Sequence, residues 1–502
     1  MSKQKKLGQV PTPKWIVDEI LELIGYNDSF IVDKYILEPS CGDGVFLNEI
    51  IICYIEEAKK LGLSNIEIVK GLETYIYGIE LDEDVYDQCI YNLNQLTQTL
   101  LGVDNIKWNI FNQNTLYIYH QFKNKFDYIV GNPPYIRIHN LDDETRNFIK
   151  DNFKFTDGSF DIYSVFFEMG FEMIKNTGKI GYITSNSFLL NSSYKKFREF
   201  LKFKQKIQTL IDFQGQHIFK GFSTYTVITI IDMCHQEDYF IYKELINDKL
   251  EVVNHIKFKD LNMNSWVFTN TDNENKIKSI KDNGNTVINE LFDVQYGFAT
   301  QRDKVFITNI KEIDGLKDIV FFNDSLMERK ILKTCVKGSK FKGTIDNTFK
   351  IIFPYKQVNN KYIPIPENEL KTKYPFCYEY LEKNKEELLK RDSDKNASWY
   401  EYGRSQGIQT MHKEKIIVNP MMLDKPNFYI IDKDVLMYSG IFITKKVPTI
   451  NWDIITNALN SEEFIQLIKL TSKNLSGGYK TITTKQIKDF TVTINDNNKL
   501  FN

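Results

Sequence analysis

Residues 36–47 read ILEPSCGDGVFL, in which a short apolar strand runs into a turn with two glycines and a helix follows. Small residues at Ser40, Gly42 and Gly44 let the backbone approach a ligand closely. Open parallel sheets bind nucleotides at the carboxyl ends of their strands, where this turn is predicted to lie. The pattern alone also fits an ordinary tight turn, so other strand ends must support a binding site.

Strands alternate with amphipathic helical stretches from about residue 9 to residue 235. This alternation is typical of a largely parallel sheet covered by helices on both faces. The expected strands are 35–37, 75–81, 128–130, 180–184, 209–213 and 225–232. After about residue 240 the segments become shorter and are interrupted by Asn-, Asp- and Pro-containing stretches. We therefore predict two domains, 1–240 and 241–502.

The strand over 75–81 carries a carboxylate near its end, Glu80. A carboxylate at this position accepts hydrogen bonds from a ribose diol in nucleotide-binding sheets. The separation from Gly44 is longer than the roughly 20 residues of the dinucleotide fingerprint, so an enlarged crossover is needed. A solvated strand-end role for Glu80 fits the sequence equally well.

The most specific pattern is FDYIVGNPPY at residues 126–135, where an apolar strand ends in Asn-Pro-Pro-Tyr. Two consecutive prolines cannot continue a strand ladder, and each restricts the residue before it. Asn132 and the Pro133 carbonyl are therefore expected to be held rigidly. The alternative is a plain strand terminator followed by a surface tyrosine, Tyr135.

Composition excludes several classes of protein. The 502 residues are 42% hydrophobic, 26% charged and 14% aromatic, as in ordinary soluble globular proteins. The net charge of -2 leaves a nucleic-acid partner open, provided that a local basic surface exists. Six cysteines without a CxxC pair argue against a disulfide framework and a zinc ribbon, so we expect no metal site and a reducing cytoplasm. No stretch of about 18 apolar residues predicts a membrane span.

The turn EPSCGDGVFL and the tetrapeptide NPPY together resemble S-adenosylmethionine-dependent amino-methyltransferases. The order of the parts is similar to that of gamma-class N6-adenine DNA methyltransferases of restriction-modification systems, which open on a Thr-Pro motif like GQVPTP at residues 8–13. The resemblance covers the whole chain, strongly in the first half. It implies a Rossmann-like class I methyltransferase domain with a mainly parallel seven-stranded sheet over 1–240. It also implies an α+β target-recognition domain over 241–502.

The resemblance implies S-adenosyl-L-methionine as the cofactor. The residues expected to bind it are Thr12, Glu38, Ser40, Gly42, Glu80, Asn114 and Phe166. Asn114 stands where the family often has an Asp on the adenine amino group of the cofactor, and its amide oxygen can still accept that bond. Phe166 is the aromatic expected to pack on the cofactor, although a core role on an amphipathic helix also fits.

Asn132, Pro133 and Tyr135 are the catalytic residues that the resemblance implies. An adenine inside a duplex cannot present its exocyclic nitrogen, so it must be flipped out and held by stacking on aromatic faces. Tyr135 and Phe219 are expected to form these faces, with Phe222 as the near alternative. The Asn132 side-chain oxygen and the Pro133 carbonyl would accept the two amino hydrogens and direct the nitrogen lone pair.

The second half resembles recognition domains of relatives that are fused to, or partner, restriction nucleases. The resemblance lies in residues 293–307, 328–342 and 399–407. Arg302, Arg404 and Gln406 are the candidate DNA-binding residues, although surface or turn roles fit at least as well. A basic run from Lys195 to Lys206 fits a phosphate-binding wall or a solvated helix face.

The sequence thus predicts a site-specific adenine DNA methyltransferase. Its expected partners are double-stranded DNA and a separately encoded restriction endonuclease, and we expect a monomer that does not bind membranes. Because the motifs begin at residue 8, we expect no preceding nuclease domain and methylation without cleavage. Exocyclic-amine chemistry alone does not separate adenine N6 from cytosine N4, but Asn instead of Ser at position 132 favours adenine.

Two alternatives remain from the sequence. One is a non-catalytic DNA-binding subunit that retains the methyltransferase fold, which the intact glycine turn and the Asn-Pro-Pro-Tyr motif argue against. The other is a protein glutamine N5-methyltransferase, which also uses Asn-Pro-Pro-Tyr. Such enzymes are usually much shorter, so the long second half favours DNA.

Overall fold

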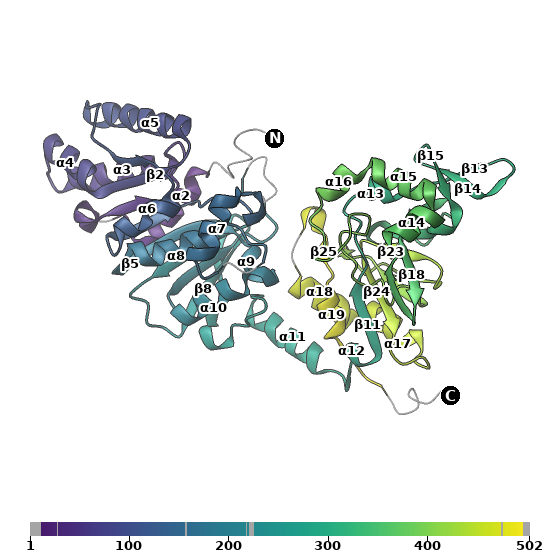
Figure 1. The fold of residues 1–502 in the computed structure, drawn as a ribbon. Helices are drawn as coiled ribbons and strands as arrows, with labels where there is room; N and C mark the ends of the chain where they lie inside the picture. Colours follow the sequence, from purple (N-terminus) through teal and green to yellow (C-terminus); the bar gives the residue numbers. More distant parts are fainter. Residues whose placement is uncertain are drawn as a thin grey trace. The chain divides into compact units, whose positions relative to one another are not determined.

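The computed structural model describes residues 12–27, 29–155, 158–216, 218–219, 225–472 and 475–494. The chain divides into two compact units, Met1–Thr271 and Asp272–Asn502, which run from purple to teal and from teal to yellow in Figure 1. The first unit therefore extends beyond the expected boundary at residue 240. The reason is a hairpin, Tyr239–Lys257, that pairs with the sheet of the first unit.

One nine-stranded sheet organises the first unit. Its strands are β1 Ile36–Glu38, β2 Ile76–Glu80, β3 Asn109–Asn112, β4 Phe126–Gly131, β5 Ile174–Ser185, β6 Ile207–Asp212, β7 Thr226–Asp232, β8 Tyr239–Ile246 and β9 Lys249–Lys257. Their order is β3-β2-β1-β4-β5-β7-β6-β8-β9. Pairing is parallel from β3 to β5 and between β6 and β8, and antiparallel for β5–β7, β6–β7 and β8–β9.

The sheet is thus larger and more mixed than the expected mainly parallel sheet of seven strands. The six predicted strands all correspond to observed ones. The prediction did not include β3, which is short and polar, or the β8–β9 hairpin, in which charged residues interrupt the apolar pattern. These strands form because their backbones find free edges of an existing sheet, a condition that local sequence does not report.

Helices cover both faces of this sheet, as predicted. They are α2 Lys14–Ile24, α3 Val45–Lys60, α4 Asn65–Tyr75, α5 Glu83–Leu101, α6 Thr115–Ile118, α7 Asp143–Asn152, α8 Tyr163–Met173, α9 Ser187–Leu190 and α10 Lys195–Lys204. Short 3-10 helices lie at Ser29–Asp33, Tyr119–Phe122, Ile138–Asn140, Ser192–Tyr194 and Phe258–Asp260.

Neighbouring strand residues alternate between two cores, one on each face of the sheet. Ile36 contributes to the core that contains residues of α2, α3 and α5, here called the α2-side core. Leu37 contributes to the core that contains residues of α8 and α10, here called the α8-side core. Alternation of this kind follows from the two-residue period of a strand, and it explains why the parallel strands read as continuous apolar runs.

The basic run on α10 is partly structural. The fully buried guanidinium of Arg198 donates to the carbonyls of residues 188, 191, 263 and 264. Lys202 donates to the carbonyls of Lys259 and Leu261, and Lys206 to that of His235. Arg198 and Lys202 hold the segment that follows the β8–β9 hairpin against α10, whereas Lys206 binds the turn between β7 and β8. This part of the run is therefore accounted for without phosphate.

Small sheets and short helices make the second unit an α+β structure (Figure 1). Its four-stranded sheets have the orders β11-β24-β20-β22 and β12-β17-β16-β23, and a three-stranded sheet has the order β13-β14-β15. The strands are β10 Thr286–Val287, β11 Phe292–Tyr296, β12 Ile307–Asn309, β13 Lys311–Ile313, β14 Leu316–Phe322, β15 Ser325–Glu328, β16 Leu332–Lys337, β17 Phe349–Ile352, β18 Tyr355–Val358, β19 Lys361–Pro364, β20 Lys415–Val418, β21 Met421–Met422, β22 Phe428–Ile431, β23 Leu436–Tyr438, β24 Ile441–Lys445, β25 Lys480–Thr481 and β26 Thr491–Val492.

The helices of this part of the chain are α11 Thr271–Asp282, α12 Ile288–Leu291, α13 Asp303–Phe306, α14 Glu367–Lys373, α15 Pro375–Lys383, α16 Lys385–Leu389, α17 Trp452–Asn460, α18 Glu462–Thr471 and α19 Thr484–Lys488. Two apolar clusters form its core, one around Phe298, Tyr402 and Phe442 and the other around Phe292, Ile441 and Phe464. In the part of the chain that the structure describes, no helix is long and apolar enough to cross a membrane.

Candidate active site

The glycine turn follows β1 at the carboxyl edge of the sheet. Gly42 and Gly44 both adopt left-handed backbone conformations, with φ of 55° and 92°. At Gly44 an added Cβ would lie 2.9 Å from the Sγ atom of Cys89, so the turn has no room for a side chain there. The Cys41 N–H donates to the Ile79 carbonyl at 2.9 Å and joins the turn to β2. Glycine is needed at these positions because other residues rarely adopt this backbone conformation.

Glu80 joins the end of β2 to this turn. One carboxylate oxygen accepts from the Gly42 N–H and the other from the Asp82 N–H, both at 2.9 Å. The residue is 8% exposed, so a solvated strand-end role does not describe it. Burial raises the pKa of the Glu80 carboxyl, while the N–H donors oppose that shift. A carboxylate has lone pairs for further donors, so Glu80 can still accept from a ligand hydroxyl.

Glu38 is buried at the end of β1 and is only 3% exposed. Its Oε2 atom has no hydrogen-bond partner among the described residues. Burial, followed by the nearby Cys89, Asp43 and Glu80, raises the pKa of the Glu38 carboxyl well above its ordinary value. A buried acceptor without a donor is costly, and a ligand with a cationic amino group would relieve that cost.

Asn132 is held by residues from two distant parts of the chain. Its side-chain nitrogen donates to the Thr12 hydroxyl at 3.1 Å, and its backbone carbonyl accepts from the Ser40 hydroxyl at 3.4 Å. Thr12 itself is 8% exposed. Before Asn132, an added Cβ at Gly131 would lie 3.4 Å from the Cγ atom of Glu38. The Thr-Pro motif, the glycine turn and Asn-Pro-Pro-Tyr therefore meet at one edge of the sheet; residues 8–11 of the first motif lie outside the described residues.

Tyr135 is anchored to the neighbouring strand. Its hydroxyl donates to the Ile183 carbonyl on β5 at 3.3 Å, and its ring contacts the ring of Tyr163 edge to face at a centroid distance of 6.3 Å. Burial raises the pKa of the Tyr135 phenol well above its ordinary value, so the hydroxyl stays a donor. The ring packs against both cores of the first unit.

Phe219 lies in the α2-side core, against which Tyr135 also packs. It is 1% exposed, so it does not offer a free face for stacking in this conformation. Phe222, the near alternative, lies outside the described residues. The structure thus brings Tyr135 and Phe219 to one apolar cluster.

The remaining predicted cofactor residues have local roles. The Asn114 side chain accepts from the Leu116 N–H at 3.0 Å and caps α6. The next residue, Thr115, donates to the Pro39 carbonyl at 2.6 Å, which places this cap beside the glycine turn. Phe166 is 5% exposed within the α8-side core, so its role in the described structure is packing.

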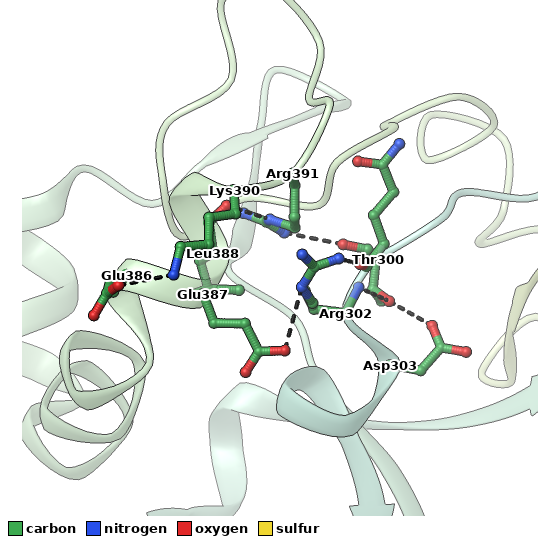
Figure 2. Close-up of polar contacts among 9 residues, drawn as sticks. Thr300, Arg302, Asp303, Glu386, Glu387, Leu388, Lys390 and Arg391 are labelled. Carbon is green, nitrogen blue, oxygen red and sulfur yellow. Dashed lines mark hydrogen bonds and ion pairs between the residues drawn. The ribbon is translucent and has the colours of Figure 1, made fainter. Parts of the chain in front are cut away.

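The three DNA-binding candidates of the second unit are engaged within the protein. The Arg302 Nε atom lies 3.2 Å from Glu387 Oε1 (Figure 2). Arg404 lies 2.7 Å from an Asp392 oxygen and 3.4 Å from an Asp394 oxygen. Gln406 donates to the Gly297 carbonyl at 3.2 Å. Both arginine side chains remain about one third exposed, at 33% and 32%.

Sequence reasoning missed Arg391, which organises this region. Its guanidinium is 8% exposed and donates to the carbonyls of Leu388, Trp399, Thr300 and Glu401. Figure 2 shows Arg391 reaching the Thr300 backbone beside Arg302. Burial lowers the pKa of Arg391 to about 10. No sequence signal distinguishes this arginine from a surface one, because its carbonyl partners come from separate loops.

Comparisons with known proteins relate both units to restriction-modification enzymes. Residues 70–219 match the Eco57I restriction-modification methylase family. Over 554 aligned residues the chain is 26% identical to the Type II restriction enzyme and methyltransferase RM.Eco57I of Escherichia coli, covering 93% of this chain and 54% of that protein. The Type II methyltransferase M.BstVI of Geobacillus stearothermophilus is 27% identical over 263 residues, covering 48% of this chain and 46% of that protein.

The Type II methyltransferase M.BanIII of Aneurinibacillus aneurinilyticus is 25% identical over 450 residues, covering 79% of this chain and 72% of that protein. The chain spans about half the length of RM.Eco57I and of M.BstVI. Among solved structures, the Type IIL restriction-modification enzyme MmeI in complex with DNA has a TM-score of 0.60 at 14% identity, covering 96% of this chain and 68% of that one. The chain thus has homologues among Type II methyltransferases and shares a mixed α/β fold with a restriction-modification enzyme.

Proposed function

We propose that this chain is an S-adenosylmethionine-dependent DNA methyltransferase of a restriction-modification system, which methylates the exocyclic N6 of an adenine flipped out of double-stranded DNA. The observation that carries the proposal is the position of Asn132. Its amide is fixed by Thr12 and its backbone by Ser40, and the preceding residue, Gly131, lies against the buried Glu38 side chain. The similarity to Type II methyltransferases supports DNA as the substrate.

The residues around the glycine turn fit the cofactor. Glu38 would accept from its amino group, because the Oε2 atom is buried and has no partner among the described residues. Glu80 would accept from the ribose hydroxyls, and Gly42 and Ser40 would allow close approach of the backbone. When bound, S-adenosyl-L-methionine supplies the activated methyl group on its sulfonium. Thr12, Asn114 and Phe166 are proposed to complete this site.

Asn132 and Pro133 are proposed to prepare the adenine nitrogen. The lone pair of that nitrogen is delocalised into the ring, so the amino group is a poor nucleophile. By accepting its two hydrogens, the Asn132 oxygen and the Pro133 carbonyl favour a pyramidal nitrogen with a directed lone pair. The hydrogen bond from Asn132 Nδ2 to Thr12 fixes the orientation of the amide, so that the nitrogen faces Thr12 and the oxygen faces away from it. Positioning of this kind lowers the barrier without reorganisation during the reaction.

Tyr135 and Phe219 are proposed to stack on the flipped base. Tyr135 is the better prepared of the two, since its hydroxyl is fixed to the Ile183 carbonyl. Phe219 is buried, so its side chain would have to rotate to offer its ring while its backbone keeps its place. Unstacking a base costs a few kcal/mol, which aromatic contacts in the pocket would recover.

The second unit, Asp272–Asn502, is proposed to recognise DNA. Arg302, Arg404 and Gln406 are the candidate contacts. When DNA binds, the two arginines would leave their carboxylate partners within the protein and contact phosphates or base edges. Double-stranded DNA is the proposed substrate and a separately encoded endonuclease a proposed partner, with this chain acting as a monomer that methylates without cleaving. Similarity to a Type II enzyme over 93% of the chain supports this function over a protein glutamine methyltransferase.

Arg404→Ala is expected to weaken binding to DNA and to reduce the slope of log K against log salt by about one, because one cation that meets phosphate is lost. The change also leaves Asp392 and Asp394 without a cation, and their charges repel phosphate. Fluorescence anisotropy over a salt series measures both effects. Arg329→Ala, which removes a half-buried arginine paired with Glu312, is the matched control. Equal affinities and slopes for Arg404→Ala and wild type would contradict the assignment.

Sequencing that maps modified bases tests the proposed function. The full chain is expressed in cells that lack their own adenine and cytosine methylation, with an empty vector as control. We expect N6-methyladenine within one recurring sequence only where the chain is present. Marks restricted to N4-methylcytosine would overturn the adenine assignment. The absence of any mark, together with no methyl incorporation into DNA by purified protein, would overturn the proposal.

A further inference from the structure

The segment that follows β6 is tied to the β8–β9 hairpin, the part of the sheet that sequence reasoning did not predict. The Gln214 side chain donates to the Tyr242 hydroxyl at 2.9 Å and to a Glu244 oxygen at 3.0 Å. Two residues later, Gln216 donates to the Leu245 carbonyl at 2.8 Å. All three partners lie on β8. These two side chains thus tie residues 214–216 to β8.

The same segment is fixed from its other side by Asp212, the last residue of β6. One Asp212 oxygen accepts from the Gln214 N–H at 2.9 Å and from the Asn186 side chain at 3.1 Å. The Asn186 N–H donates to the Tyr225 carbonyl at 3.0 Å, and the Phe213 N–H to the Thr226 carbonyl at 3.1 Å. The ends of β5, β6 and β7 therefore join at the point where this segment leaves the sheet.

Tyr242 stands at the centre of the hydrogen-bond network. It is 1% exposed, and its hydroxyl donates to the Glu244 oxygen at 2.9 Å while it accepts from Gln214. Burial raises the pKa of the Tyr242 phenol, so the hydroxyl remains a donor at physiological pH. A buried network in which donors and acceptors are paired favours one conformation over alternatives.

Gln214 adopts a conformation that needs such support. Its φ is 53°, in the left-handed region that side chains rarely occupy. A non-glycine residue there costs on the order of 1 kcal/mol or more, so it persists where surrounding bonds determine it. Phe213 and Phe219, on either side of Gln214, both pack in the α2-side core against which Tyr135 packs.

We propose that the β8–β9 hairpin is a positioning device for the base pocket, with Tyr242 and Glu244 acting through Gln214 on its neighbour Phe213 and on the pocket residue Phe219. Tyr242 and Glu244 are positioning residues, since they touch neither base nor cofactor in this proposal. The inference rests on the proposed function, because the place of Phe219 matters to the reaction only if a flipped base stacks there.

Tyr242→Phe tests this inference, because it removes one hydroxyl and retains the ring. Tyr239→Phe is the matched control: it lies on the same strand, and no hydrogen bond of its hydroxyl is present within the described residues. Glu244→Gln is the second variant and removes the charge from the same network. Melting temperatures of all three show whether the fold is retained.

Amide hydrogen exchange is measured at Phe213, Gln214 and Gln216 in the full chain. One hydrogen bond contributes about 1 kcal/mol, so we expect exchange about fivefold faster in Tyr242→Phe and in Glu244→Gln than in Tyr239→Phe. Single-turnover methylation of DNA that carries the mapped site should fall by a similar factor. The affinity for S-adenosylmethionine should change by less than about twofold, since the glycine turn is untouched.

The fluorescence of 2-aminopurine at the target position reports whether the base is outside the duplex. A loss of protein stability alone would not change this emission in the folded complex. We expect weaker emission on binding in Tyr242→Phe, because fewer complexes hold the base outside the duplex. Equal exchange in Tyr242→Phe and Tyr239→Phe would overturn the inference. Faster exchange with wild-type emission and rate would overturn it as well. Both of these outcomes presuppose that the wild-type protein methylates DNA. If the wild-type protein methylates no DNA, the proposed function has failed and the inference fails with it.

Discussion

Asn132→Ala is expected to reduce single-turnover methylation by about 100- to 1,000-fold, the effect of removing one preorganised polar group from a site where charge develops. The variant loses the oxygen that accepts an amino hydrogen of the target base. It also loses the bond from Nδ2 to Thr12, which contributes only about 1 kcal/mol to stability. The protein should therefore still fold and still bind S-adenosylmethionine.

The measurements are incorporation of a labelled methyl group into DNA, cofactor affinity by calorimetry, and melting temperature. Asn140→Ala is the matched control, an exposed asparagine at the end of the 3-10 helix that follows the motif. It should methylate at the wild-type rate. Wild-type activity in Asn132→Ala would remove the central residue of the proposed mechanism.

Glu38→Gln is expected to weaken S-adenosylmethionine binding by about 10- to 100-fold, since a charge-assisted hydrogen bond contributes about 1.5–3 kcal/mol. The same change should stabilise the protein without cofactor. Its Oε2 atom is buried with no partner among the described residues, so a neutral side chain avoids the cost of ionising a buried carboxyl there. Opposite effects on binding and stability separate a ligand-binding role from a packing role.

The stabilising effect depends on pH with a definite sign. The folded pKa of Glu38 lies well above its ordinary value of 4.5. Well below pH 4.5 the carboxyl is protonated in both the folded and the unfolded state. The free energies of unfolding of wild type and Glu38→Gln should therefore differ least there. As the pH rises above 4.5, ionisation favours the unfolded state and the wild type loses stability relative to the variant.

Thermal melting from pH 4 to pH 8 and calorimetry with S-adenosylmethionine measure these effects. A gain of about 1 kcal/mol corresponds to roughly 2–4 °C in melting temperature for a unit of this size. Glu168→Gln is the control, a buried glutamate on α8 whose carboxylate accepts from the Lys154 N–H at 3.0 Å. It should leave cofactor binding unchanged. Unaltered cofactor affinity in Glu38→Gln would exclude Glu38 from the site.

The fold of the first unit was largely predictable because its central strands are buried on both faces. Such strands read as apolar runs, and the glycine turn and the double proline mark where two of them end. The β8–β9 hairpin was not predictable in the same way. Its strands are half exposed and carry Lys243, Glu244 and Glu251, so they resemble irregular surface chain. For this reason the predicted boundary at residue 240 falls before the hairpin and not after it.

The local geometry of the candidate site was predictable where it depends on single residue types. Gly42, Gly44 and the residues of Asn-Pro-Pro-Tyr have conformational preferences that belong to the residue types themselves. The residues whose role depends on burial were harder to judge. Phe166 and Phe219 fit both a ligand wall and a core, and the structure buries them in the two cores of the first unit.

The motifs and their order along the chain could be read from the residues, because strand, turn and proline preferences act over a few residues. Which groups meet depends on the tertiary structure. Thr12 reaches Asn132 across 120 residues of chain, and Tyr242 reaches Gln214 from a strand added at the far side of β6. For the same reason the Glu38 Oε2 atom has no partner among the described residues, and Arg391 donates to four carbonyls. Burial and hydrogen-bond pairing depend on elements that are distant in sequence, and the packing of those elements determines the electrostatics of the site.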